Sequence, residues 1–353
     1  MKADGKYKLG VALHSGTSFP VGKVTRLRLY PMDLEEFYWA LGMQIQTKEA
    51  HDAIENLRRP LIASDFKDIF QQYLAVGGMP AVVSEWVESK NISHVEMILK
   101  NILADYRDDF SKHTTNAESR KIGNLWRSVP QQFAKENHKF TYKTVAPSAR
   151  GRDYAFALDW LLDAGLIYKI DLTVHGDKLP LSFYFNNSDF KIYGLDVGLL
   201  RQLAGLSTSV VIDDDNIWSN FGGAFAENFV LQQLRSLGFD ETYYWASNAD
   251  NPNQPKGKSE LDFVVSTENL IIPIEVKSGE QVKAQSLRVF RNKYNPELSI
   301  RFSLKGLDYN EGLLNIPLYY SFLFNDLIAQ KRSSPSSSFT FVKEQSIQPS
   351  SNE

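Results

Sequence analysis

Residues 259–279 constrain the fold more strongly than any other part of the chain. Two runs rich in β-branched and aromatic residues flank a polar segment at 267–270, a pattern typical of an antiparallel β-hairpin with a four-residue loop. This loop length predicts that Ser266 pairs with Ile271. We therefore expect two neighbouring strands of one sheet, joined by a tight turn.

The same register predicts an unusual gathering of charge. Because side chains alternate between the two faces of a strand, Asp262 should face Glu275 and Glu260 should face Lys277, while the opposite side of the hairpin is apolar. Like charges directly opposite each other destabilise a sheet. Two carboxylates beside a lysine suit an oxygen-preferring divalent ion, Mg²⁺ or Mn²⁺, that also holds a phosphate.

A further acidic residue stands in the preceding helical segment, residues 219–238. This segment opens with a cap-forming serine, ends at a glycine and carries apolar residues at helical spacing. The spacing places Glu227 on the apolar side, where a carboxylate without a partner is costly. We interpret Glu227 as part of the site. The alternative is a glutamate at the edge of the face with its carboxylate in solvent.

The arrangement Asp262-x12-Glu275-x-Lys277 resembles the PD-(D/E)xK nuclease superfamily. The resemblance implies that Asp262 and Glu275 ligate a metal ion, that Lys277 positions or polarises the attacking water, and that Glu227 is the additional acid from the preceding helix. Leu261 stands in place of the proline that gives the motif its name. The expected catalytic set is therefore Glu227, Asp262, Glu275 and Lys277.

The segments 17–24, 29–37 and 73–80 resemble the late part of a prokaryotic AAA-type ATPase family. Members of that family carry a C-terminal nuclease-like domain of the DUF4143-like kind, and the resemblance extends to about residue 325. The glycine-rich segment 16–23 differs from a phosphate loop, because it has one residue too many between its glycines and Val24 where the magnesium-binding Ser or Thr should stand. We expect a truncated or degenerate member of that family that binds no ATP.

The middle of the chain has the pattern of a winged-helix domain. Helical segments around 122–137 and 150–164 are followed by two strand-like runs, 166–172 and 181–185. Helix, turn, helix and a β-wing occur in this order in winged-helix proteins, some of which bind DNA and others protein.

Five basic residues are candidates for contacts with nucleic acid: Lys143, Arg150, Arg152, Lys283 and Arg288. The first three surround the start of the candidate recognition helix, and the other two follow the hairpin. Because the net charge is −3, a nucleic-acid surface must be local. The alternative for each group is a solvated helix face.

Composition excludes several classes of protein. The chain has no cysteine, so disulfides and thiolate metal sites are absent. The sequence shows neither a signal peptide nor a run of the roughly 18 apolar residues that a membrane span needs. We therefore expect a cytoplasmic protein without membrane association.

With 353 residues, 43% of them hydrophobic, the chain is long enough for two or three domains. We predict an α/β (α+β multidomain) protein: a helical AAA-type remnant at 1–110, a winged-helix middle at 111–210, a restriction-endonuclease-like mixed sheet flanked by helices at 215–325, and a disordered serine-rich tail at 326–353.

Three functions are compatible with these patterns. The first is a metal-dependent nuclease acting on DNA. The second is a non-catalytic DNA- or protein-binding regulatory module, and the third is an ATPase remnant that works through a partner chain. The intact set of acids and lysine favours the first. The sequence leaves open whether the protein also binds a protein partner or a second copy of itself.

Overall fold

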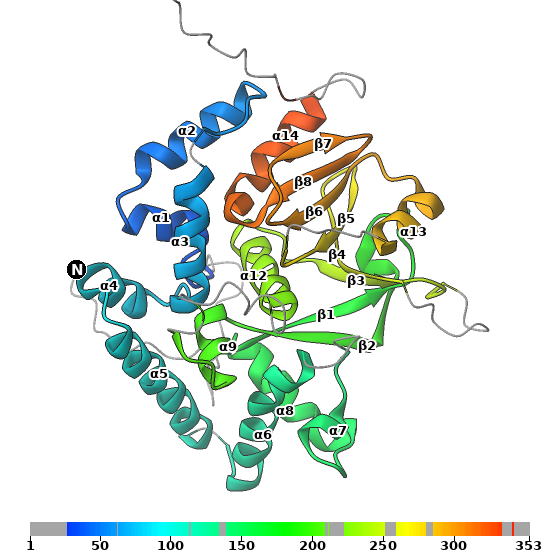
Figure 1. Cartoon of the computed structure of the whole chain (residues 1–353). Coiled ribbons are helices and arrows are strands. Elements are labelled where there is room, and N and C mark those ends of the chain that lie inside the picture. Colours follow the sequence, from blue (N-terminus) through cyan, green and yellow to red (C-terminus); the bar gives the residue numbers. More distant parts are fainter. Residues whose placement is uncertain are drawn as a thin grey trace, which may run out of the picture.

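A mixed β-sheet organises the chain (Figure 1). The computed structural model describes residues 27–61, 63–112, 114–133, 139–208, 211, 222–250, 259–279, 285–333 and 341. Within these residues the sheet has eight strands in the order β2-β1-β3-β4-β5-β6-β8-β7. The strands are β1 (Ile167–Thr173), β2 (Phe185–Gly194), β3 (Thr242–Ala246), β4 (Glu260–Ser266), β5 (Ile271–Val276), β6 (Ser299–Ser303), β7 (Asp308–Asn310) and β8 (Leu313–Pro317).

Helices precede the sheet in the chain and cover it, which confirms the predicted α/β class with a helical N-terminal part. The N-terminal helices are α1 (Leu34–Ala40), α2 (Gln44–Glu55), α3 (Ala63–Val76), α4 (Pro80–Ser89) and α5 (Ile92–Lys112). Helix α1 begins with a capping box, in which Asp33 and Glu36 each accept a hydrogen bond from the backbone N–H of the other. In Figure 1 these helices lie on the opposite side of the molecule from β5 to β8.

The remaining helices lie between and after the strands. They are α6 (Asn116–Phe133), α7 (Tyr142–Val145), α8 (Gly151–Asp163), α9 (Val197–Leu203), α12 (Gly222–Ser236), α13 (Gln285–Tyr294) and α14 (Phe324–Ser333), with short 3-10 helices at Leu181–Phe183 and Leu318–Leu323. The helices expected around 122–137 and 150–164 correspond to α6 and α8.

The two strands expected as a β-wing belong to the main sheet. Strand β1 pairs with β2 as expected, but it also pairs in parallel with β3, where Leu172 is the partner of Tyr244. The second strand starts at Phe185 instead of Leu181, because residues Leu181–Phe183 form a 3-10 helix whose first side chain is buried. The pair therefore extends the C-terminal sheet instead of projecting as a separate wing.

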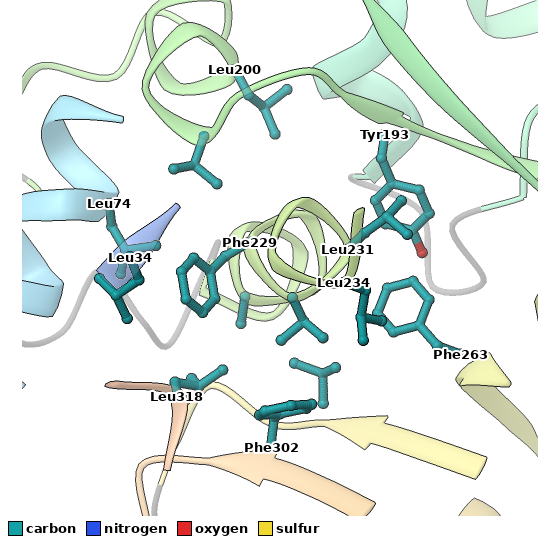
Figure 2. Packing of buried hydrophobic residues seen from close by; sticks show 14 of the residues in the cluster. Leu34, Leu74, Tyr193, Leu200, Phe229, Leu231, Leu234, Phe263, Phe302 and Leu318 are labelled. Carbon is teal, nitrogen blue, oxygen red and sulfur yellow. The ribbon is translucent and has the colours of Figure 1, made fainter. Parts of the chain in front are cut away.

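Helix α12 lies at the centre of the hydrophobic core. Phe229, Leu231 and Leu234 are at most 1% exposed, and Figure 2 shows them pointing from different sides of the helix. Phe229 packs in the same cluster as Leu34 of α1, and Leu231 in the same cluster as Tyr193 of β2. A helix that buries apolar residues all round is a core element. Packing around α12 thus joins the N-terminal helices, the middle segment and the sheet.

A buried polar network at Asp196 joins the same three regions. Its carboxylate accepts hydrogen bonds from the N–H groups of Gly78 (2.7 Å) and Leu199 (2.9 Å). The side-chain amide of Gln232 on α12 donates to Asp196 (3.2 Å) and to the hydroxyl group of Tyr73 (2.8 Å). Because Asp196 is fully buried, each of these groups needs its protein partner.

The tail predicted as disordered from residue 326 begins with an ordered helix. Leu327, Ile328 and Lys331 of α14 are buried, and their spacing of one, three and four residues is that of a helix face against a core. The prediction was wrong for residues 326–333, because a polar composition masked this short apolar stripe. The rest of the tail except Phe341, and the glycine-rich segment 16–23, lie outside the described residues.

Candidate functional site

The predicted hairpin forms with the predicted register near its turn. Strands β4 and β5 are antiparallel, and Ser266 is the partner of Ile271. The ladder continues to Phe263, the partner of Ile274. The loop length therefore indicated the register correctly over these four pairs.

The register differs from the prediction at Asp262. We expected the ladder to continue with Asp262 directly opposite Glu275; instead the carboxylate Oδ2 of Asp262 accepts a hydrogen bond from the backbone N–H of Val276 (2.7 Å). Oδ2 thus stands where a backbone carbonyl of β4 would otherwise accept. The side chain of Asp262 lies at the point where the two strands stop pairing, beside the backbone of Glu275.

A β-bulge in β4 explains this change. Val264 is the partner of Tyr243 and Leu261 is the partner of Trp245, so two residues of β4, Asp262 and Phe263, lie opposite one residue of β3. Bulges redirect side chains and are frequent beside active sites. Leu261 accordingly packs with Trp245 in the smaller core cluster, away from Phe263.

The predicted catalytic residues come together from three elements. Lys277, just after β5, has its Nζ atom 2.8 Å from Oε1 of Glu275. Burial alone would lower the pKa of Lys277, but the negative charges of Asp262, Glu275 and Glu227 outweigh burial and raise it. The lysine thus lies within electrostatic reach of all three acids.

The pKa of Asp262 shows how close these charges are. Burial raises the pKa of Asp262 to about 7, and the charge of Glu227 adds to the shift, while Lys191 and Lys277 oppose it. Any positive charge added near Asp262 would stabilise its ionised carboxylate and lower its pKa.

Glu227 is held inside the protein. It is 7% exposed, and its Oε2 atom accepts a hydrogen bond from the hydroxyl group of Tyr193 at 3.1 Å. Its carboxylate therefore points into the core side of α12 and not into solvent. Tyr193 lies on β2, which connects the site to the middle of the chain.

Sequence reasoning missed two residues of the site, both on β2: Lys191 and Tyr193. Lys191 is 2% exposed, and its Nζ atom lies 2.8 Å from Oε1 of Glu260. The other oxygen of Glu260 lies 3.5 Å from Lys139. The simple register predicted that Glu260 would face Lys277. Instead, Glu260 pairs with Lys191 and Lys139. The local sequence carries no signal for this, because β2 and β4 are far apart in the chain.

Asp262 and Glu275 are the two carboxylates that would hold a divalent ion. Asp262 and Glu275 each accept one backbone N–H, from Val276 and Leu287 respectively, which orients them while a carboxylate can accept several further bonds. Mg²⁺ is commonly bound by one or two carboxylates, with substrate phosphate and water completing the shell. Among the described residues, no group of three or more His, Cys, Asp or Glu side chains is arranged to hold a metal ion.

The candidate nucleic-acid residues fall into two places. Lys143 on α7, Arg150 before α8 and Arg152 in its first turn are all exposed. The two helices touch, since the ring of Tyr142 lies 3.2 Å from the place where a Cβ atom of Gly151 would be. Arg288 is exposed on α13, which packs against β4 and β5. Lys283 lies outside the described residues.

Fold and site together define a class: an α/β protein whose mixed sheet carries a partly buried cluster of acids and lysines at the end of a central hairpin. Residues 222–320 match the family described as a domain of unknown function (DUF4143), and residues 67–210 match another domain of unknown function (DUF8612). Comparison with curated proteins and with solved structures gives no match. No helix in the described ranges is long and apolar enough to cross a bilayer.

Proposed function

We propose that this protein is a metal-dependent, DNA-binding nuclease that hydrolyses phosphodiester bonds at the hairpin. The observation that carries the proposal is the convergence of Glu227, Asp262, Glu275 and Lys277 from α12, β4 and the end of β5. Glu227 and Glu275 are at most 7% exposed and Asp262 is half-buried, and the charge of Glu227 helps to raise the pKa of Asp262. Like charges held together in this way are typical of functional sites.

Each residue has a role that follows from its position. Asp262 and Glu275 would hold Mg²⁺ or Mn²⁺, which supplies Lewis acidity toward the phosphate and lowers the pKa of bound water. Lys277, beside Glu275, orients the attacking water and offsets the negative charge that develops on the phosphate. Glu227 accepts a hydrogen bond from Tyr193, and its negative charge raises the pKa of Asp262.

DNA binding is assigned to basic residues outside the buried cluster. Exposed Lys143, Arg150 and Arg152 form one group, and Arg288 lies near the hairpin. Contacts with phosphates give affinity that falls with rising salt, and they do not require the acidic site to be intact.

Substitutions in the hairpin test the proposal. With Mg²⁺ or Mn²⁺ and several DNA forms, Asp262→Asn and Lys277→Ala should each lower the cleavage rate at least roughly a hundredfold, with DNA affinity nearly unchanged. Glu268→Gln is the matched control, because Glu268 lies in the turn of the same hairpin with a side chain 84% exposed. Absence of metal-dependent cleavage by the unaltered protein on every DNA form would refute the nuclease function.

One observation favours a second candidate, a non-catalytic DNA- or protein-binding regulatory module. The carboxylates of Glu275 and Glu260 are already paired with Lys277 and Lys191 at 2.8 Å, so the cluster can be stable without a metal ion. This candidate predicts DNA binding without cleavage and an Asp262→Asn variant that binds DNA as the unaltered protein does.

A further inference from the structure

The connection between β1 and β2 carries an exposed group of apolar side chains. Phe183 is 78% exposed, Phe185 is 44% exposed and Leu179 is 38% exposed. We call Leu179, Phe183 and Phe185 the aromatic tip. Isolated exposed apolar residues are ordinary, but two phenylalanines and a leucine on one short connection indicate a contact surface.

The aromatic tip stands on a firmly packed base. Leu181, between its members in sequence, is fully buried in the cluster that contains Leu287 and Phe290 of α13. Gly176 approaches α13 so closely that a Cβ atom there would lie 2.4 Å from the ring of Phe290. Below the tip, the N–H of Val174 donates to the carbonyl oxygen of Tyr184 at 2.8 Å. The backbone of this connection is therefore anchored before any partner binds, which lowers the entropy cost of binding.

Helix α13 links the aromatic tip to the candidate catalytic site. At its start, the N–H of Leu287 donates to Glu275; at its end, Tyr294 and Phe290 lie against Gly176. The seven helical steps from Leu287 to Tyr294 span about 10 Å of helix, roughly three nucleotides at the 3.4 Å spacing of a stacked strand. Figure 1 shows α13 beside the ends of the strands at this side of the sheet.

Cationic side chains occur along this route. Arg288 is exposed on α13, and Nζ of Lys178 lies 5.6 Å from the centre of the Tyr184 ring, next to the tip. The neighbouring Asp177 lies 3.8 Å from His175. Lys293, at the end of α13, is paired with Asp250 at 2.8 Å. The charge is thus modest, and the exposed rings are the main feature of the surface.

We propose that the aromatic tip stacks on unpaired bases of a nucleic-acid strand whose backbone passes Arg288 on its way to Lys277. Every base has a flat face that can stack on phenylalanine, so binding needs single-stranded character and no particular sequence. Bases inside a duplex are already stacked and are not available to the tip. The inference rests on the proposed nuclease function for its direction, and it identifies the substrate as nucleic acid with an unpaired segment.

The test compares binding of short fluorescent oligonucleotides by anisotropy, in an Asp262→Asn background that prevents cleavage. Phe183→Ala with Phe185→Ala should weaken binding of single-stranded oligothymidylate by roughly tenfold or more. Binding of blunt duplex should change less than about twofold, because it depends on phosphate contacts. Ile45→Ala is the matched control, since Ile45 is 83% exposed on α2 and belongs to the N-terminal helices.

An abasic oligonucleotide separates stacking from charge. It should bind the double variant and its parent equally, because both retain the same cations. Equal affinity of the double variant and its parent for single strands, or an equal loss on duplex, would overturn the inference. A change in self-association with no change in single-strand binding would assign the tip to protein contacts and would also overturn it.

The same measurements distinguish this inference from the proposed function. If the unaltered hairpin cleaves nothing, but single-strand binding still depends on Phe183 and Phe185, the nuclease function fails and the binding surface stands. If cleavage of single strands proceeds and neither binding nor rate responds to the double substitution, the nuclease function stands and the aromatic tip has no role in it.

Discussion

Tyr193 donates a hydrogen bond from its hydroxyl group to Oε2 of Glu227, with 3.1 Å between the two oxygens. Tyr193 lies in the segment that matches one family of unknown function, and Glu227 in the segment that matches the other. The candidate site is therefore built from both segments. Strand β2 supplies the hydrogen bond from Tyr193 and the buried cation of Lys191.

Replacement of Lys191 by methionine tests the contribution of that cation. Because Lys191 is 2% exposed and pairs with Glu260, its loss leaves a partly buried carboxylate with one lysine fewer. Breaking a fully buried ion pair costs roughly 3–5 kcal/mol; Glu260 keeps Lys139 as a partner, so we expect about 2 kcal/mol in the free energy of unfolding, measured with urea.

Lys139→Met is the control for this substitution. Its side chain is 21% exposed and lies 3.5 Å from Glu260, so its loss should cost less than about 1 kcal/mol. A Lys139→Met variant that is less stable than Lys191→Met would contradict the assignment of Lys191 as the main partner of Glu260.

The ion pairs of His51 predict a stability that depends on pH. Its Nε2 atom lies 2.8 Å from Glu35, and its Nδ1 atom contacts Asp326 of α14. Hydrogen bonds to Asp326 and Glu35 outweigh burial and raise the pKa of His51 to about 10, from an ordinary value of 6.5. Because the folded-state pKa is the higher one, the contribution is fully present below pH 6.5 and is lost as pH rises through about 10.

His51→Gln removes the titrating group while keeping a polar side chain. The difference in free energy of unfolding between the unaltered protein and the variant should be largest below pH 6.5 and should shrink as the pH rises from 6.5 to about 10. Urea titrations of both proteins at several pH values measure it. A difference that stays constant over this range would show that folding does not raise the pKa of His51.

The hairpin could be predicted because its information is local. Ser266 and Ile271 are separated only by a four-residue turn, and the turn length determines their pairing. The helix with Glu227 was equally accessible, because its apolar spacing and its terminal glycine lie within one segment.

The rest of the site depends on contacts between distant residues. The parallel pairing of Leu172 on β1 with Tyr244 on β3 joins β1, and with it the neighbouring β2, to the rest of the sheet. No sequence pattern near Leu172 or Tyr244 specifies this pairing, because many apolar strands could occupy that edge. From the sequence alone, Lys191 therefore cannot be distinguished from an ordinary lysine on a strand. The bulge at Asp262 could not be predicted from the sequence either, since the extra residue is defined only by the pairing with the partner strand.

Gly78 tests the junction between the N-terminal helices and the rest of the chain. A Cβ atom at Gly78 would lie 2.0 Å from the carbonyl oxygen of Met32, whose own N–H donates to Gly78 at 2.7 Å. The close contact is therefore between the backbones of Gly78 and Met32, and the N–H of Gly78 also donates a hydrogen bond to buried Asp196. Gly78→Ala therefore forces the two backbones apart and should lower the free energy of unfolding by about 3 kcal/mol or more.

Gly223→Ala is the matched substitution with the opposite expected sign. Gly223 lies in α12 with no atom within 4 Å of a Cβ placed there, and alanine in a helix is more stable than glycine by about 0.5–1 kcal/mol because the unfolded chain loses less freedom on folding. Urea unfolding of both variants measures the two effects. If Gly78→Ala were as stable as the unaltered protein, the close approach of Met32 to Gly78 would be wrong, and with it the packing that joins the N-terminal helices to Asp196.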